Sequence, residues 1–202
     1  MQDSPVIALD VDNTLLDFDS HWRACAEETL QRPITKIASP YSLSGRFGTT
    51  SDETKLIWKR FIADHWMATI PAYPTSAKMI ADLRELGASL WAVSSVHTSS
   101  HEERCESLRG LIPADRVICI GSPDTHPSKA PVLQEIGAQA LLDDLPIHVK
   151  DAQGVIEYPV LLDQHYDGFD TSDVDYSVQT HAEFVEFWRQ IVLSTAALMQ
   201  QP

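Results

Sequence analysis

Residues 6–16 have the sequence Val-Ile-Ala-Leu-Asp-Val-Asp-Asn-Thr-Leu-Leu, in which a short apolar run ends abruptly in charged and polar side chains. The apolar run predicts a buried strand. Side chains alternate between the two faces of a strand, so Asp10 and Asp12 would point the same way if the extended geometry continues past Leu9. The stretch alone leaves two interpretations open. It is either a site that holds a divalent cation and a reacting group, or a strand that runs into a solvated acidic turn.

The composition narrows the class of protein. The chain has 202 residues, 44% of them hydrophobic and 22% charged, which is typical of a globular protein with a sizeable core. Lys and Arg total 15 against 29 Asp and Glu, a formal net charge of −14. This balance argues against a nucleic acid polymer as partner, because clustered positive charge supplies most of the affinity for a phosphate backbone. A small phosphorylated metabolite stays compatible if a metal and a few donors neutralise it.

The first residues and the cysteines suggest no special location or covalent framework. Residues 1–5 contain no basic leader, and the apolar run after them is too short for a signal-peptide core or a membrane span. We therefore expect a cytoplasmic protein without a membrane partner. Cys25, Cys105 and Cys119 are scattered and lack CxxC spacing, which predicts packing residues rather than a disulfide framework or a zinc site.

Apolar runs alternate with amphipathic segments along the rest of the chain. We expect strands at residues 6–9, 88–94, 117–120, 140–142 and 160–162 and helices at residues 19–30, 51–66, 75–86, 101–108, 129–136 and 148–153, with a last helix after Thr180. The acidic segment 163–175 predicts a surface loop. Because parallel strands need crossovers of this length, the pattern predicts an α/β fold, a three-layer Rossmann-like parallel sheet with helices on both faces.

One part of the chain is helical and turn-rich without a predicted strand. It covers residues 18–71 and includes Thr50-Ser51-Asp52-Glu53, a capping-box pattern that opens a helix. We expect a core domain of residues 1–17 and 72–202, with residues 18–71 as a small helical insert after the first strand.

Three of the predicted strands end in polar residues or are followed directly by them, and a lysine precedes one of these strands. They are Asp10 and Asp12, Ser94 and Ser95, and Asp143 and Asp144, with Lys129 before the last pair. In a parallel sheet these side chains meet at one edge. Clustered carboxylates repel one another unless a cation lies among them, and ligands that are all oxygens suit Mg²⁺. Hydroxyl, backbone N–H and ammonium donors suit the oxygens of a transferring phosphoryl group. The set predicts metal-assisted phosphoryl transfer.

In these motifs the sequence resembles the haloacid dehalogenase (HAD) superfamily. Its first motif, Asp-x-Asp-x-Thr, matches residues 10–14, and its second, a serine or threonine at a strand end, matches Ser94. The third, a lysine, matches Lys129, and the fourth, an acidic pair after an apolar strand, matches Asp143-Asp144. All four occur in order between residues 6 and 162.

The resemblance implies a role for each matched residue. Asp10 would be the nucleophile that forms an aspartyl-phosphate and also a Mg²⁺ ligand, while Asp12 would be the general acid and then the general base. The backbone carbonyl of Asp12 and the Asp144 carboxylate would bind the metal, with Asp143 acting through water. Lys129 would neutralise the phosphoryl group and orient Asp10. Phosphate binding would fall to Ser94, Ser95 and Lys129. An aspartate at position 12 favours a phosphatase over a dehalogenase, and the insert matches the small cap of this superfamily.

Within the superfamily the chain is most similar to the 5'(3')-deoxyribonucleotidases. The shared features are Leu-Leu-Asp-Asp at residues 141–144, a following helix and Gly154, a strand leading to Tyr166-Asp167, and a tryptophan in the last helix. The asparagine usual after that tyrosine is Asp167 here, and the usual glycine-valine pair of the first motif is Asn13-Thr14. The resemblance implies a Mg²⁺-dependent phosphomonoesterase acting on a nucleoside monophosphate.

Aromatic residues in or beside the insert offer stacking surfaces for a base. These are Phe18, Trp22, Phe47 and Trp66. The alternative for each is that it packs the insert against itself. Two other functions stay open: a phosphatase for sugar phosphates or other small metabolites, and a non-catalytic module that binds a phosphorylated metabolite.

Overall fold

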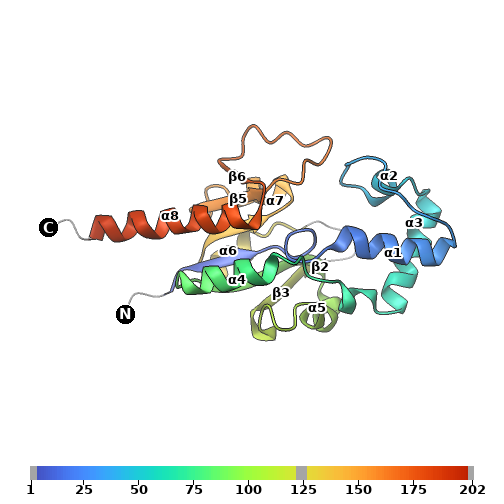
Figure 1. Cartoon of the computed structure of the whole chain (residues 1–202), viewed down its shortest axis with the longest axis horizontal. Helices are drawn as coiled ribbons and strands as arrows, with labels where there is room; N and C mark the ends of the chain where they lie inside the picture. Colours follow the sequence, from blue (N-terminus) through green and yellow to red (C-terminus); the bar gives the residue numbers. More distant parts are fainter. Residues whose placement is uncertain (1–3, 122–126, 200–202) are drawn as a thin grey trace.

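The computed structural model describes residues 4–121 and 127–199, without the side chains of residues 198 and 199. Its centre is one sheet of six parallel strands in the order β3-β2-β1-β4-β5-β6 (Figure 1). The strands are β1 (Val6–Leu9), β2 (Ser89–His97), β3 (Val117–Gly121), β4 (Ala138–Asp143), β5 (Tyr158–Leu162) and β6 (Tyr176–Val178). Strand β1 therefore lies in the middle, between β2 and β4.

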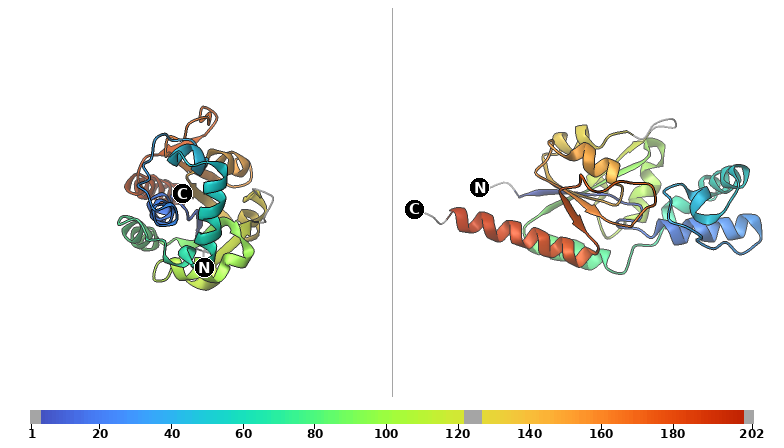
Figure 2. Two further views of the ribbon diagram at one scale, coloured as in Figure 1. Left: turned by 90° about the vertical axis from the view of Figure 1, so that its right-hand side faces the viewer. Right: turned by 90° about the horizontal axis from the view of Figure 1, so that it is seen from above.

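Helices cover both faces of the sheet. They are α4 (Ser76–Glu85), α5 (His101–Ser107), α6 (Ala130–Glu135), α7 (Pro146–Ala152) and α8 (His181–Met199), with short 3-10 helices η2 (Thr98–Ser100) and η3 (Ala114–Arg116). Because side chains alternate between the two faces of the sheet along β1, the contacts of its residues show which helices pack on which face. Ile7 and Leu9 belong to the main core cluster with residues of α4 and α8, whereas Ala8 packs in a second cluster with residues of α6 and α7. Figure 2 shows α4 and α8 on one side of the sheet and α6 and α7 on the other.

This architecture confirms the predicted three-layer parallel α/β fold. The sixth strand, β6, is absent from the prediction because three residues after an acidic loop give no readable alternation. Helix α5 begins at His101, and its N-cap residue, Ser100, makes no side-chain capping hydrogen bond. The expectation about a leader rests partly on residues 1–3, which lie outside the described residues. Among the helices of the described chain, none combines the length and apolar character needed to cross a bilayer.

The segment between β1 and α4 is helical and projects beyond the carboxyl ends of the strands (Figure 1). It contains α1 (Phe18–Leu30), α2 (Leu43–Phe47), α3 (Ser51–Ala63) and the 3-10 helix η1 (Trp66–Thr69). The predicted capping box opens α3, since Glu53 N donates to the Thr50 hydroxyl and Thr50 N donates to the Glu53 carboxylate. Two hydrogen bonds join the entering and leaving chains: Asp17 N to Pro71 O, 2.8 Å, and Tyr73 N to Leu15 O, 3.0 Å.

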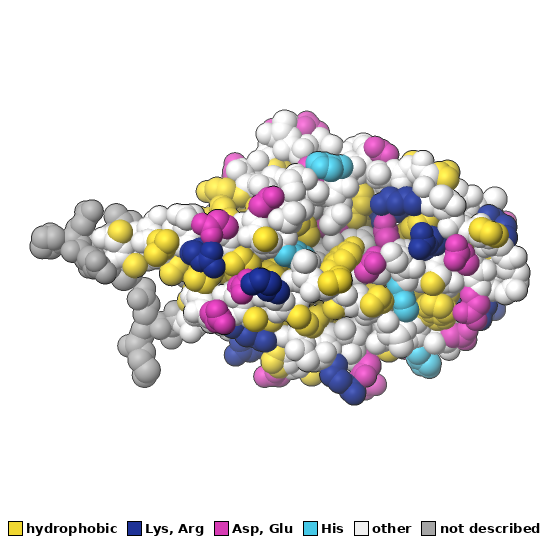
Figure 3. Space-filling model, viewed as in Figure 1, with side chains coloured by type: hydrophobic (Ala, Val, Ile, Leu, Met, Phe, Trp, Pro, Cys, Tyr) yellow, Lys and Arg dark blue, Asp and Glu magenta, His cyan; other side chains and the backbone are white. Residues whose placement is uncertain are grey.

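Charge is mixed on the surface. On the face that Figure 3 shows, lysine and arginine side chains are interspersed with aspartate and glutamate. A group of charged side chains is buried instead inside the molecule, at the carboxyl ends of the central strands.

Candidate active site

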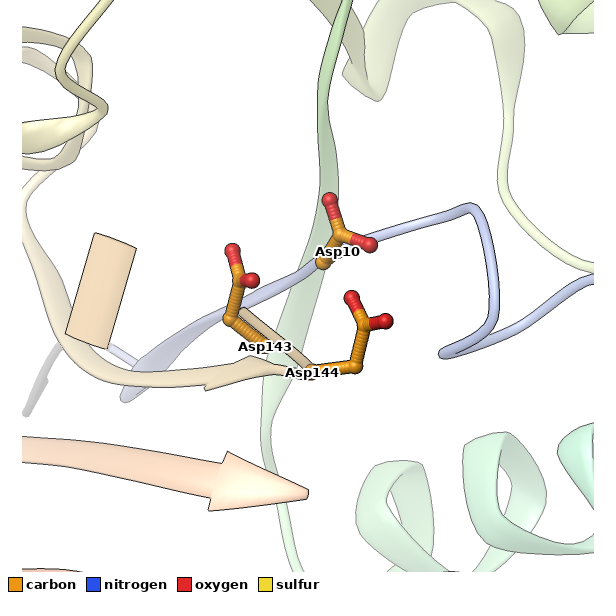
Figure 4. Close-up of side chains that lie close together, drawn as sticks. All are labelled: Asp10, Asp143 and Asp144. Atoms are coloured by element: carbon orange, nitrogen blue, oxygen red, sulfur yellow. The ribbon is translucent and has the colours of Figure 1, made fainter. Parts of the chain in front are cut away.

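The register of the central strands places the acidic residues side by side. Leu9 pairs with Leu142 of β4, and the Asp10 N–H donates to the carbonyl of Leu142 at 2.8 Å. Asp10 and Asp143 therefore follow paired residues at the same level of the sheet. Figure 4 shows the side chains of Asp10, Asp143 and Asp144 extending to the same side of these strand ends. One carboxylate oxygen of each lies within 4.8 Å of the other two, and we call these three residues the carboxylate cluster.

Lys129 is the cation of this cluster. It stands at the N-cap position of α6, is fully buried, and donates to Asp10 Oδ1 and, at 2.6 Å, to Asp143 Oδ2. The other oxygen of Asp143 accepts a hydrogen bond from Leu145 N at 2.9 Å. Each oxygen of Asp143 accepts a hydrogen bond from the protein, so this residue helps to hold Lys129 and the turn after β4 in place.

Burial changes the protonation of the cluster. It raises the pKa of Asp10 to about 7; the charge of Lys129 opposes this shift, and that of Asp143 adds to it. Burial also raises the pKa of Asp143, and it raises the pKa of Asp144 with help from the charges of Asp10 and Asp143. For Lys129 burial acts to lower the pKa, but the two neighbouring carboxylates raise it.

The donor set fits a divalent cation. Three buried carboxylates share one buried ammonium, which leaves negative charge that a dication would balance. The donors are all oxygens, the ligand type that Mg²⁺ prefers.

Asp144 is connected to the first motif by a chain of hydrogen bonds. The hydroxyl of Tyr166 donates to Asp144 Oδ2 at 2.5 Å and accepts from the Asn13 amide at 3.1 Å. Asn13 has a positive φ of 58°, a conformation that asparagine tolerates better than most residues, and its side-chain oxygen Oδ1 accepts a hydrogen bond from Asp19 N at the start of α1. The Arg46 guanidinium lies 4.7 Å from the centre of the Tyr166 ring. The insert therefore contacts the cluster through Tyr166 and Asn13.

Asp12 lies beside the cluster and has a partner of its own. Its Oδ2 accepts a hydrogen bond from Arg104 Nη2 of α5 at 2.6 Å, and its Oδ1 has no partner within the described part of the chain. Arg104 is fully buried. Nothing in the local sequence of α5 distinguishes this arginine from a surface one, so it does not appear among the predicted site residues.

The two serines of the second motif have different surroundings. Ser94 is buried, and its hydroxyl is 3.5 Å from Val96 N. Ser95 lines the cavity in front of the cluster, and its hydroxyl lies 3.1 Å from Nε2 of His148, a residue of α7 that also lines this cavity. His148 is another residue absent from the predicted set.

The cavity has a volume of about 560 Å³, within the range of small-molecule sites. Asp10, Asp12, Asp143 and Asp144 form its floor. Its walls come largely from the insert, where the aromatic residues Phe18, Tyr41 and Trp58 line it together with the hydroxyl residues Ser42, Ser44 and Thr54. Within the described residues no lysine or arginine lines this cavity.

The four aromatic residues predicted for substrate contact separate in the structure. Phe18 lines the cavity and stacks on Trp58, with ring centres 5.9 Å apart. Trp22 is fully buried and stacks on Phe47, which borders a neighbouring polar cavity. Trp66 packs on His21 and Phe61 inside the insert. The structure thus places Phe18 at the cavity, together with Trp58 and Tyr41, which the sequence did not single out.

Comparisons with known proteins address the fold. No protein-family model matches this sequence, and no curated protein matches it. Solved structures match over nearly its whole length. A HAD family hydrolase from Deinococcus radiodurans R1, with bound phosphate and sodium, has a TM-score of 0.60 and 15% identity over 90% of this chain and 94% of that one. CbbY from Rhodobacter sphaeroides in complex with xylulose-(1,5)bisphosphate has a TM-score of 0.57 and 17% identity over 90% and 96%. An L-2-haloacid dehalogenase has a TM-score of 0.61 and 15% identity over 93% and 100%.

The chain thus has the fold of the HAD hydrolases. Because the similar structures include a dehalogenase as well as phosphate-bound and sugar-phosphate-bound proteins, the fold does not select the reaction. The reaction must instead be inferred from the side chains of the site.

Proposed function

We propose that this chain is a Mg²⁺-dependent phosphomonoesterase that works through an aspartyl-phosphate on Asp10. The observation that carries the proposal is the position of Lys129, which is fully buried and bonded to both Asp10 and Asp143 beside a third carboxylate. A buried ammonium and a dication on either side of Asp10 would balance the charge of an incoming phosphate. A 2-haloacid carries one negative charge, whereas a phosphate monoester brings up to two.

The reaction divides into two steps. Asp10 attacks phosphorus, the bond from phosphorus to the ester oxygen breaks, and Asp12 donates a proton to that leaving oxygen. Asp12 then accepts a proton from a water molecule that attacks the phosphorus, which releases inorganic phosphate and restores the Asp10 carboxylate. The hydroxyls of Ser94 and Ser95 and the ammonium of Lys129 would bind the oxygens of the phosphoryl group.

The metal ligands in this proposal are Asp10, Asp144 and the backbone carbonyl of Asp12, with Asp143 acting through water. When bound, Mg²⁺ supplies positive charge that stabilises the transferring phosphoryl group. Tyr166 supports the arrangement from the chain itself, because its hydroxyl fixes one oxygen of Asp144 and leaves the other for the ion.

The proposed substrate is a nucleoside monophosphate, and residues 18–71 are the cap that closes over it on the core of residues 1–17 and 72–202. Three aromatic side chains around the cavity support a flat, neutral group beyond the phosphate. The lack of lining cations among the described residues disfavours any substrate with a second anionic group. The second candidate is a neutral sugar monophosphate. It is supported by the hydroxyls of Ser42, Ser44 and Thr54 and by the sugar phosphate bound in CbbY.

A substrate panel with Mg²⁺ tests the proposal. We expect hydrolysis of a nucleoside monophosphate, weaker hydrolysis of a sugar monophosphate, and the least hydrolysis of a sugar bisphosphate. Asp10→Asn should lower the turnover of each good substrate at least ~10⁴-fold, because it removes the nucleophile. The matched control is Asp170→Asn, a neutralised aspartate in the exposed loop, which should keep full activity.

The panel has three informative outcomes. Preference for sugar monophosphates would replace the nucleotide with the second candidate. Absence of hydrolysis for every ester, with tight binding of inorganic phosphate, would favour a non-catalytic binding module. Release of halide from a 2-haloacid would overturn the phosphatase proposal.

A further inference from the structure

Arg104 has an unusual environment for an arginine. Its side chain is fully buried, and one nitrogen, Nη2, makes both of its hydrogen bonds, to Asp12 Oδ2 at 2.6 Å and to Met67 Sδ at 3.0 Å. Its Nε and Nη1 atoms have no partner among the described residues. Arg104 lies behind Asp12 and Met67, which both line the cavity, and does not line it itself.

Stability alone does not account for this arginine. A buried guanidinium with a single ion pair and two unpartnered nitrogens is costly to desolvate, and apolar residues of similar volume often stabilise a core equally well. The pairing does have an effect on Asp12. It fixes the carboxylate through Oδ2, while Oδ1 is buried and has no protein partner in the described chain.

We propose that Arg104 is a positioning residue for the proton transfer by Asp12. By holding Oδ2, it sets the side-chain rotamer of Asp12 and with it the position from which this carboxylate can reach the leaving oxygen of the ester. Met67 belongs to η1 of the insert, so the same guanidinium also contacts the cavity wall that closes the site. This inference rests on the proposed phosphomonoesterase function and adds a residue to it.

A comparison of two esters with different leaving groups tests the positioning role. Benzyl phosphate and 4-nitrophenyl phosphate are close in size, but the benzyl alkoxide needs a proton to leave and the nitrophenolate does not. We expect Arg104→Met to lower kcat/KM for benzyl phosphate about 10²-fold, as for a misplaced general acid, and for 4-nitrophenyl phosphate only a few-fold. The ratio kcat/KM is the appropriate quantity because it reports the first step, in which the ester bond breaks.

A double-mutant cycle supplies a second readout. Asp12→Asn should reproduce the same leaving-group preference, and the combination of Arg104→Met with Asp12→Asn should be no slower than Asp12→Asn alone, because both changes remove one function. Arg109→Met is the matched control. It removes an exposed arginine just after the same helix, paired with Glu106, and should leave both esters unchanged.

The outcomes separate this inference from the function on which it rests. Equal losses on both esters, or additive losses in the cycle, would show a merely structural arginine and overturn the inference while the phosphatase stands. If the wild type hydrolyses neither these two esters nor any ester of the substrate panel, both proposals fail. If Arg104→Met does not fold, Arg104→Lys keeps the charge and should show the same leaving-group preference to a smaller degree; an unchanged ratio there overturns the inference.

Discussion

Two regions of this molecule are rich in aspartate, and their surroundings give that residue opposite properties. In the carboxylate cluster, burial raises the pKa of Asp10, Asp143 and Asp144. In the acidic loop of residues 163–175, most of the aspartates are exposed, and a backbone hydrogen bond from Ser172 lowers the pKa of Asp170. The comparison shows that a carboxylate becomes a candidate for chemistry through its burial and its partners rather than through local acidity.

The partners of the two regions also differ. Lys129 is fully buried between two carboxylates, whereas Lys150 reaches Asp173 of the loop across 3.6 Å at the surface. Solvent screens the second pair and not the first. The loop has a structural task instead, because Asp167 exchanges hydrogen bonds with Ser39 of the insert.

The largest expected contrast comes from removing each lysine. Lys129→Met should lower the free energy of unfolding by about 3 kcal/mol at neutral pH, because it leaves buried carboxylates without their cation. Lys150→Met should change it by less than about 0.5 kcal/mol, as expected for an exposed pair. Urea unfolding of both variants in EDTA measures the difference. Equal losses of stability in the two variants would mean that the cluster is hydrated, so that its carboxylates do not depend on a neighbouring cation.

The sequence predicted more of the core than of the site. Asp10, Lys129 and Asp143 meet because parallel strands bring their carboxyl ends together, and that rule is readable from apolar runs of the right length. Arg104 was not predictable in the same way. Its burial depends on how α5 packs against η1, a tertiary contact that no period in residues 101–107 encodes.

The boundaries of the helices and the residues of the cavity wall could not be predicted from the sequence either. Helix α1 begins one residue before the predicted start, at Phe18, because Asp17 accepts the capping hydrogen bond from Ser20 N. Trp58 and Trp22 lie on neighbouring helices and look alike in the sequence, yet Trp58 lines the cavity and Trp22 is in the core. Only the packing of α1 against α3 separates them.

The next contrast is the pH dependence of stability in the metal-free protein. The pKa of Asp10 is about 7 in the folded chain against an ordinary 3.8, so the folded state binds protons that the unfolded chain releases. The free energy of unfolding should therefore fall as the pH rises from about 4 to 7, by up to about 3 kcal/mol. Urea titrations in EDTA across this range measure it, and Asp10→Asn should reduce the slope to the part that comes from Asp143 and Asp144, whose pKa values are also raised.

The contribution of Asp170 to the pH dependence of stability has the opposite sign. Its pKa is lowered, so its contribution is present above the unfolded pKa and is lost as the pH falls below about 4. Asp170→Asn should leave the slope between pH 4 and 7 unchanged. A slope that is unchanged in Asp10→Asn but disappears in Asp170→Asn would reverse the assignment of the two regions.

The smallest effect concerns the link between the regions, Tyr166, which lies within the acidic loop and bonds Asp144 of the cluster. Tyr166→Phe should weaken Mg²⁺ binding about 10-fold, because Asp144 loses the donor that orients it. Isothermal titration with Mg²⁺ measures the affinity without reference to catalysis. Tyr176→Phe, in β6, is the control and should bind as the wild type does; an unchanged affinity in Tyr166→Phe would remove Asp144 from the proposed metal ligands.

The position of β1 in the middle of the sheet has a consequence for the order in which this chain can fold. Asp10 and Lys129 are 119 residues apart, and Asn13 and Tyr166 are 153 apart, so the cluster closes some of the longest loops in the molecule. Such contacts form late, since the chain entropy they cost must be offset by pairing of the central strands. A partly folded chain, in which β1 has not met β4, holds no assembled cluster. Mg²⁺ binding would therefore report the pairing of β1 with β4.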